Sequence, residues 1–125
     1  MANEEKSVKV DFSCGRKDKL LKKPEFDLVF KQGRRSRGKR IEFIYLKNGL
    51  GRSRIGLVVS RKVGKSVIRS RAKRILREVF RLNRGSLAYD IDLVARPYPG
   101  LGLFTFDEAE TEFLRMAKKL GSYGA

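Results

Sequence analysis

The segment 61–77 constrains this chain more than any other, because it is strongly basic and also has the periodicity of a helix. It reads RKVGKSVIRSRAKRILR, with eight Lys/Arg in seventeen residues. Its apolar residues recur at helical spacing and form one stripe: Ile68, Ala72, Ile75, Leu76 and Val79. The opposite side carries polar and basic residues: Ser70, Lys73, Arg74, Arg77 and Arg81. The pattern therefore predicts a helix over about 66–83, with one core face and one cationic face.

The net charge of the chain points to a polyanionic partner. The sequence has 30 Lys/Arg against 14 Asp/Glu, a formal net charge of +16. Self-repulsion of this size opposes folding unless a polyanion compensates it. Nucleic acid is the leading candidate, and an anionic membrane surface is the second. At 125 residues the chain is long enough for one domain with an ordinary hydrophobic core.

Missing residue types weigh against several kinds of chemistry. The sequence has no histidine and one cysteine, Cys14. It therefore lacks the commonest general acid–base, a disulfide framework and a thiolate zinc site. No apolar run approaches the roughly 18 residues of a membrane span, and the N-terminus lacks the apolar core of a signal peptide. We predict a cytoplasmic protein that does not use a membrane.

The remaining patterns predict an α+β sandwich with a small mixed sheet. We expect residues 1–19 to form a flexible tail and residues 20–122 to form a single domain. The elements expected, in the order α-β-β-α-β-α, are a helix at 20–30, strands at 41–46 and 55–60, the basic helix at 66–83, a strand at 89–95 and a helix over 106–120. A capping box, Thr105 with Glu108, marks the start of the last helix. The basic run 34–40 is expected to be a loop or a strand edge.

Two local patterns invite an enzymatic interpretation, and neither is strong. The run GKS at Gly64 is similar to the end of a phosphate-binding loop, but that motif needs a glycine five residues earlier, where Val59 stands. A simple strand-to-helix turn is favoured. Asp90 and Asp92 alternate with apolar residues and would share one side of a strand. A solvated strand edge is favoured over a paired-carboxylate metal site.

Aromatic residues near the basic segments offer stacking faces for unpaired bases. Phe26 and Phe30 are four residues apart in the first helix, and Phe43 and Tyr45 alternate on the first strand. We expect the four rings to line one cleft, with the strand as floor, the helix as wall and Tyr45 the most exposed. Core packing is the alternative for each ring. Folded RNA fits better than DNA, because the basic helix has no Asn or Gln before Asn83 to read base edges.

The ordered set of segments closely resembles the protein subunit of bacterial ribonuclease P. The resemblance covers roughly residues 16–120. It rests on the run RIGLVVSRK at 54–62 and on the run GKSVIRSRAKRILREVF at 64–80. The second run contains the Arg-Asn-Arg box of the family, which stands here as RSR at 69–71. At Ser70 a hydroxyl therefore replaces the family amide, with shorter reach and one fewer donor.

The resemblance implies a function. Ribonuclease P removes the 5′ leader from precursor tRNA, and in the bacterial enzyme the RNA subunit holds the magnesium ions and carries out the hydrolysis. This chain would be the non-catalytic protein component, with the catalytic RNA and precursor tRNA as partners and no cofactor of its own. A left-handed strand–helix–strand crossover around the basic helix is also implied. The alternative is a general RNA-binding protein of ribosomal type without a processing role, and a membrane-active cationic protein is a third possibility.

The predicted site residues form two sets, and neither contains a catalytic or metal-binding residue. By resemblance, the first set contacts the catalytic RNA near its active centre: Arg61, Lys62, Lys65, Arg69, Ser70, Arg71, Lys73, Arg74 and Arg77. The resemblance implies a leader cleft between the first helix and the sheet, and to this cleft we assign the second set: Phe26, Phe30, Phe43 and Tyr45.

Overall fold

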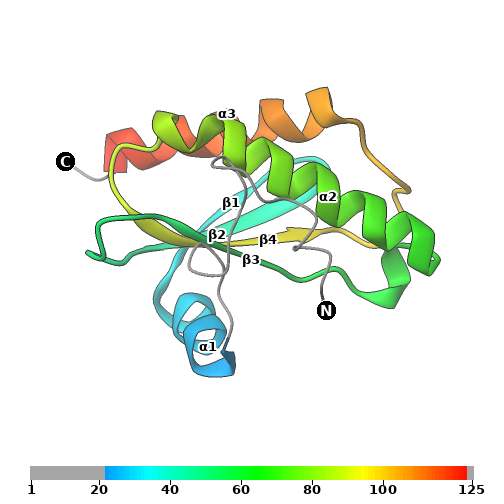
Figure 1. The fold of residues 1–125 in the computed structure, drawn as a ribbon, viewed down its shortest axis with the longest axis horizontal. Coiled ribbons are helices and arrows are strands. Elements are labelled where there is room, and N and C mark those ends of the chain that lie inside the picture. The colour runs from blue at the N-terminus through cyan, green and yellow to red at the C-terminus, as the bar shows by residue number, and fades with distance from the viewer. Residues whose placement is uncertain (1–21, 124–125) are drawn as a thin grey trace.

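The computed structural model describes residues 22–123, which contain three α-helices and one four-stranded sheet (Figure 1). In chain order the elements are α1 (Lys23–Gln32), β1 (Arg34–Arg37), β2 (Ile41–Lys47), β3 (Arg54–Leu57), the 3₁₀ helix η3 (Arg61–Val63), α2 (Ser66–Asn83), the 3₁₀ helix η4 (Arg84–Ser86), β4 (Ile91–Pro97) and α3 (Phe106–Tyr123). The predicted α+β class with a mixed sheet is confirmed. The predicted tail, residues 1–19, lies outside the described residues.

The sheet has the strand order β1-β2-β4-β3. β2 is antiparallel to both β1 and β4, whereas β3 and β4 run parallel. A parallel pair needs a crossover connection, and here α2 supplies it, with η3 and η4 at its two ends. The strand–helix–strand unit expected around the basic helix is therefore present. The left hand of the crossover, which the resemblance implies, stays a prediction.

Strand boundaries differ from expectation where backbone pairing decides them. The basic run 34–40 contains β1, an edge strand that pairs with β2. Charged side chains suit such a position, because they discourage the free edge from pairing with other chains. β3 ends at Leu57, three residues earlier than expected, although the amide of Val58 still donates to the carbonyl of Ala95 at 3.0 Å. β4 extends two residues farther than expected, to Pro97, because its pairing with β2 continues to that point.

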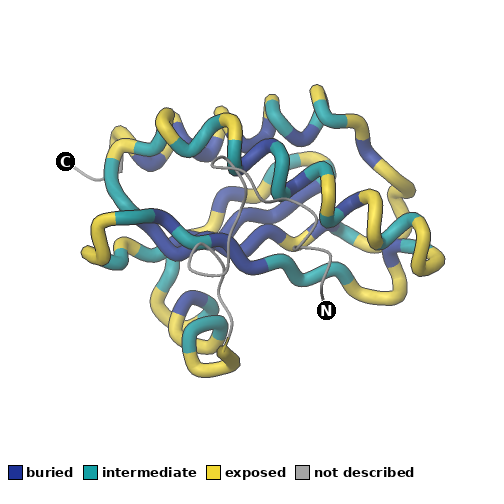
Figure 2. Tube along the Cα trace, viewed as in Figure 1, coloured by how far each residue is buried: buried dark blue, intermediate teal, exposed yellow. Residues whose placement is uncertain are grey.

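The two faces of the sheet are covered unequally (Figure 1). α2 and α3 pack on one face, called the α2/α3 face, and α1 packs on the other, called the α1 face. Odd-numbered residues of β2 and β4 join the larger core cluster with Phe80 of α2 and Phe113 of α3. Even-numbered Ile44 and Val94 form a smaller cluster with Val29 of α1. Buried positions accordingly concentrate in the sheet and on the inner sides of the helices (Figure 2).

Sequence periodicity explains how the two long helices pack. α2 buries residues of the predicted stripe and one phenylalanine beside it: Ala72, Leu76, Val79 and Phe80. α3 begins with the predicted capping box, which the structure confirms. The amide of Thr105 donates to Glu108 Oε1 at 2.9 Å, and the amide of Glu108 donates to Thr105 Oγ1 at 3.1 Å. Over residues 22–123, no helix combines the length and the apolar character needed to cross a membrane.

Candidate nucleic-acid interface

The predicted RNA-binding residues lie along η3 and the outer side of α2. We define them as the basic surface: Arg61, Lys62, Lys65, Arg69, Ser70, Arg71, Lys73, Arg74 and Arg77. Six of the nine are exposed and three are half-buried, so each reaches solvent. Because the apolar stripe of α2 is buried against the sheet and α3, the helix presents the basic surface outward (Figure 2).

Several cations of the basic surface form no ion pair with a carboxylate of the described residues. Within residues 22–123, no carboxylate forms an ion pair with Lys65, Arg71 or Arg74. Arg81 differs, because it forms an ion pair with Glu78 one turn earlier in the same helix. The predicted cationic side of α2 is therefore strongest in its first half. Clustered cations without counter-charges produce a positive potential that attracts a polyanion.

The turn before α2 orders one arginine of the basic surface. Arg69 donates from Nη1 to the carbonyl oxygen of Gly64 at 3.0 Å, and its amide donates to the carbonyl of Lys65 at 2.9 Å. This is the strand-to-helix turn that the sequence favoured over a nucleotide-binding loop. The first-turn amides of α2 add partial positive charge beside these side chains. Phosphate is the chemical group that this combination suits.

Phe26 and Phe30 lie where α1 meets the sheet. Both are half-buried and pack against the smaller core cluster. Their assignment to a leader cleft stays a prediction. The other apolar residues of this face are Val29, Ile44, Leu46, Val58 and Val94. None of these five was predicted to line the leader cleft. The available signal was that Ile44 and Leu46 share one side of a strand, opposite the side of Phe43.

Phe43 and Tyr45 do not line the α1 face, so the predicted four-ring cleft is wrong. Both belong to the larger core cluster on the α2/α3 face, where the Phe43 and Phe113 ring centroids lie 5.9 Å apart. Tyr45 was expected to be the most exposed of the four, but only 4% of its surface is exposed. The reason is the two-residue alternation of β2, since α1 covers the other side of the strand. Neither ring has a free face for base stacking in this fold.

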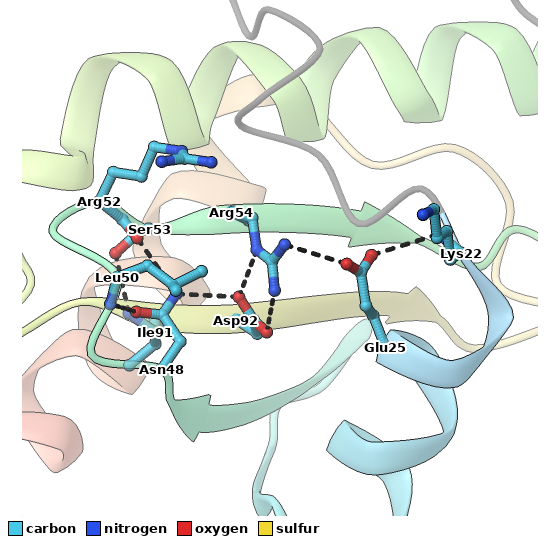
Figure 3. A network of polar contacts seen from close by, with 9 residues as sticks. All are labelled: Lys22, Glu25, Asn48, Leu50, Arg52, Ser53, Arg54, Ile91 and Asp92. Atoms are coloured by element: carbon cyan, nitrogen blue, oxygen red, sulfur yellow. Dashed lines mark hydrogen bonds and ion pairs between the residues drawn. The ribbon is translucent and has the colours of Figure 1, made fainter.

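An ion-pair network ties the N-terminal end of α1 to the sheet (Figure 3). Arg54 donates from Nη2 and Nε to the two carboxylate oxygens of Asp92, at 2.7 and 2.8 Å, and from Nη1 to Glu25 Oε2 at 3.1 Å. Asn48 donates to the same Asp92 carboxylate at 2.9 Å. The hydrogen bonds to Asp92 raise the pKa of Arg54, so the guanidinium remains charged. The network fixes the position of α1 over its apolar cluster.

Asp90 and Asp92, which were expected to share a solvated strand edge, have different surroundings. Asp92 is 6% exposed, and Arg54 occupies both of its oxygens. The favoured solvated-edge interpretation is therefore wrong for Asp92. Asp90 precedes β4 and is half-buried. The register explains the difference, because Arg54 of β3 lies directly opposite Asp92 in the parallel pair.

Comparison with known proteins identifies relatives that span most of this chain. The family model for Ribonuclease P matches residues 14–121. The ribonuclease P protein component of Alkaliphilus metalliredigens is 37% identical over 103 residues, which cover 82% of this chain and 93% of that protein. The corresponding protein of Dictyoglomus thermophilum is 34% identical over 113 residues, which cover 89% and 94%.

Solved structures show the same fold. The RNase P protein from Thermotoga maritima matches with a TM-score of 0.72 at 32% sequence identity, covering 81% of this chain and 96% of that one. The RNase P protein of Staphylococcus aureus also matches with a TM-score of 0.72, covering 82% and 97%, and at 21% identity this likeness concerns the fold alone. Because the family model and the relatives cover most of the sequence, this chain belongs to the ribonuclease P protein family.

Proposed function

We propose that this chain is the protein subunit of a ribonuclease P holoenzyme, and that it binds the catalytic RNA and the 5′ leader of precursor tRNA to assist endonucleolytic removal of the leader. The observation that carries the proposal is the basic surface, where exposed cations such as Arg71 and Arg74 have no acidic partner among the described residues. A surface of this kind suits a phosphate backbone. Family membership supports RNA as that partner.

The hydrolytic step is assigned to the RNA. The sequence has no histidine, and the basic surface consists of Arg and Lys with one serine, Ser70. Arginine stays protonated and stabilises negative charge, but it does not serve as a general base. Magnesium ions held by the partner RNA supply the chemistry, and the protein binds no cofactor of its own. Its cations reduce the repulsion between two RNA molecules, which matters most when magnesium is scarce.

The leader is assigned to the α1 face. Of the four aromatic residues predicted to line the leader cleft, Phe26 and Phe30 lie on this face, and both are half-exposed. Stacking on an aromatic ring tolerates any base and contributes on the order of 1–3 kcal/mol per base. Such tolerance suits leaders that differ in sequence. The catalytic RNA is assigned to the basic surface, which begins at Arg61, shortly after β3 ends.

Reconstitution with the catalytic RNA tests the proposal. Added protein should raise cleavage of precursor tRNA at low magnesium, and the isolated protein should cleave nothing. A general RNA-binding protein of ribosomal type would bind RNA without raising cleavage. If the purified protein alone cut precursor tRNA at the mature 5′ end, with contaminating nuclease excluded, the assignment of the chemistry to RNA would be overturned.

A matched pair of variants tests the basic surface. Arg71→Ala combined with Arg74→Ala should weaken binding of the catalytic RNA. It should also lower the slope of log affinity against log salt by about 0.7–0.9 for each phosphate that the variant no longer neutralises. The control combines Lys118→Ala with Lys119→Ala, which removes the same charge from exposed positions on α3. Equal losses of affinity in the two double variants would mean that only total charge matters, and that the basic surface is not the binding site.

A further inference from the structure

A buried carboxylate on the α1 face gathers three arginines around it. Glu42 of β2 is 2% exposed. Its Oε2 accepts hydrogen bonds from Arg35 Nη1 at 3.1 Å and Arg37 Nε at 3.2 Å, and its Oε1 accepts one from Arg96 Nη2 at 2.8 Å. Arg35 and Arg37 come from β1 and Arg96 comes from β4, so both neighbours of β2 contribute. We call these four residues the Glu42 cluster.

The Glu42 cluster is strongly cationic. Three guanidinium groups surround a single carboxylate, so two positive charges are left without a counter-charge inside the cluster. Burial by itself would raise the pKa of Glu42, but the hydrogen bonds from Arg35 and Arg37 and the charge of Arg96 outweigh it and lower the pKa. The carboxylate is therefore ionised near neutral pH and holds the three arginines in defined positions.

The arginines keep unused donors on their solvent side. A guanidinium group has five N–H donors, and each of the three gives a single nitrogen to Glu42 in these contacts. The side chains of Arg35, Arg37 and Arg96 remain 34%, 71% and 45% exposed. Across residues 22–123, none of the three forms an ion pair with a second carboxylate. Glu42 therefore orders guanidinium groups whose remaining donors face the solvent. Such groups can bind a second anion, and phosphate oxygens match their geometry.

The position of the Glu42 cluster links it to the other predicted RNA contacts. The strand register places Arg37 opposite Glu42, and Glu42 opposite Arg96. Ile44, the next residue on the same side of β2, belongs to the apolar cluster beneath α1. On the other side of β4, the last residue of β3, Leu57, pairs with Ala95, which precedes Arg96. Four residues after Leu57 the chain reaches Arg61, where the basic surface begins. One end of the α1 face therefore carries the cluster and adjoins the start of the basic surface.

We propose that the Glu42 cluster is a phosphate clamp for the single-stranded RNA leader bound on the α1 face. Arg35, Arg37 and Arg96 contact one phosphodiester of the leader, and Glu42 is the positioning residue that holds them. This inference rests on the proposed function and adds a subsite that recognises the RNA backbone instead of a base. The clamp binds a backbone phosphate of the leader, so it contributes only when the leader is long enough to reach it.

Glu42→Gln separates positioning from general electrostatics, because the two predict opposite effects. The substitution raises the net charge by one, so general attraction predicts unchanged or slightly tighter binding of every RNA. The clamp predicts that the Glu42→Gln holoenzyme binds precursor tRNA with a long leader about tenfold more weakly. A loss of this size is expected when the displaced arginines lose one charge-assisted hydrogen bond to the phosphate. Binding of mature tRNA, and of precursors with leaders too short to reach the clamp, should not change. The measurement is holoenzyme affinity across a series of leaders shortened one nucleotide at a time.

Arg37→Lys keeps the test decisive if Glu42→Gln disturbs folding. The Arg37 side chain is largely exposed, and lysine preserves its charge. Lysine cannot offer the planar fork of donors, so the leader-length dependence should weaken here too. The matched control is Arg115→Lys, an identical substitution at an exposed position on α3, across the sheet from the cluster. This control should bind the whole leader series as the wild type does.

Each result counts for or against the clamp. Loss of affinity confined to long leaders in Glu42→Gln and Arg37→Lys supports it. An equal loss of affinity for mature and precursor tRNA would mean that the cluster contacts another part of the RNA. Unchanged or tighter binding of every RNA would mean that the cluster contacts none. Either outcome overturns the clamp. If the wild-type protein failed to raise cleavage by the catalytic RNA, the proposed function itself would fail, which is a separate result.

Discussion

The two faces of the sheet are stabilised by different interactions. On the α2/α3 face, the side chains of Phe43, Tyr45 and Leu93 lie beneath two helices and are almost completely buried. The α1 face has one covering helix, and it buries the carboxylates Asp92 and Glu42 toward opposite ends of the β2–β4 pair. Arginines contact both carboxylates. One face thus depends on apolar burial, whereas the other uses ion pairs to order charged side chains where RNA is proposed to bind.

Tyr45→Ala should have the largest effect on stability, because it removes a buried ring from the α2/α3 face. We expect the free energy of unfolding to fall by about 3–5 kcal/mol. Phe30→Ala is the matched comparison on the α1 face, where the ring is half-buried. The free energy of unfolding should fall clearly less in Phe30→Ala than in Tyr45→Ala, and Phe30→Ala should bind precursor tRNA more weakly. Urea unfolding of the two variants measures the difference, and equal losses would contradict the unequal burial of the two rings.

Asp92→Asn should have the next largest effect, because it breaks the forked ion pair of the α1 face. The side chains of Arg54 and Asp92 are 16% and 9% exposed, so the substitution leaves a largely buried guanidinium with Glu25 as its remaining carboxylate partner. We expect the free energy of unfolding to fall by about 3 kcal/mol.

The control for that substitution is Asp27→Asn, which breaks the exposed Lys23–Asp27 pair of α1, with 83% and 60% of the two side chains exposed. Exposed pairs of this kind contribute about 0.5 kcal/mol or less. If the free energy of unfolding fell equally in the two Asp→Asn variants, the buried ion pair would stabilise the protein no more than the exposed one. Urea unfolding under identical salt conditions provides the comparison.

The fold was predictable where a sequence pattern has two chemically different sides. The apolar stripe and cationic side of 66–83 define α2, and the capping box defines the start of α3. In β2 both sides are apolar or aromatic, with Phe43 and Tyr45 on one and Ile44 and Leu46 on the other. Alternation shows which residues share a side, but it does not show which helix covers that side. For this reason the sequence placed Phe43 and Tyr45 under the wrong helix.

The pairing of charges was harder to predict than their number. The basic surface could be found because no acidic residue occurs from 43 to 77, so local counter-charges are absent. The arginines of the α1 face find their partners only through the sheet register: Arg96 meets Glu42 across 54 positions, and Arg54 meets Asp92 across 38. Composition gives the net charge, but the fold decides which arginines are neutralised and which remain available to RNA.

The smallest expected effect concerns pH, and it tests whether Glu42 is the ionised centre of its cluster. Burial opposes ionisation of this carboxyl, yet the hydrogen bonds from Arg35 and Arg37 and the charge of Arg96 lower its pKa overall. A group whose pKa is lower in the folded state stabilises the fold above its unfolded-state pKa. That contribution disappears as the pH falls through the folded-state value. The wild-type free energy of unfolding should therefore decline as the pH falls below about 4.5.

Glu42→Gln lacks the titrating group, so its free energy of unfolding should decline less steeply over the same range. The slope is the quantity to compare, because the substitution also changes the absolute stability of the protein. Urea unfolding at a series of pH values from about 6 to 3 gives both slopes. Parallel curves would assign the acid sensitivity to other carboxylates and would remove the evidence that Glu42 is held in its charged form. A shallower curve for Glu42→Gln would show that the three arginines keep this carboxylate ionised, which is the condition on which the proposed clamp depends.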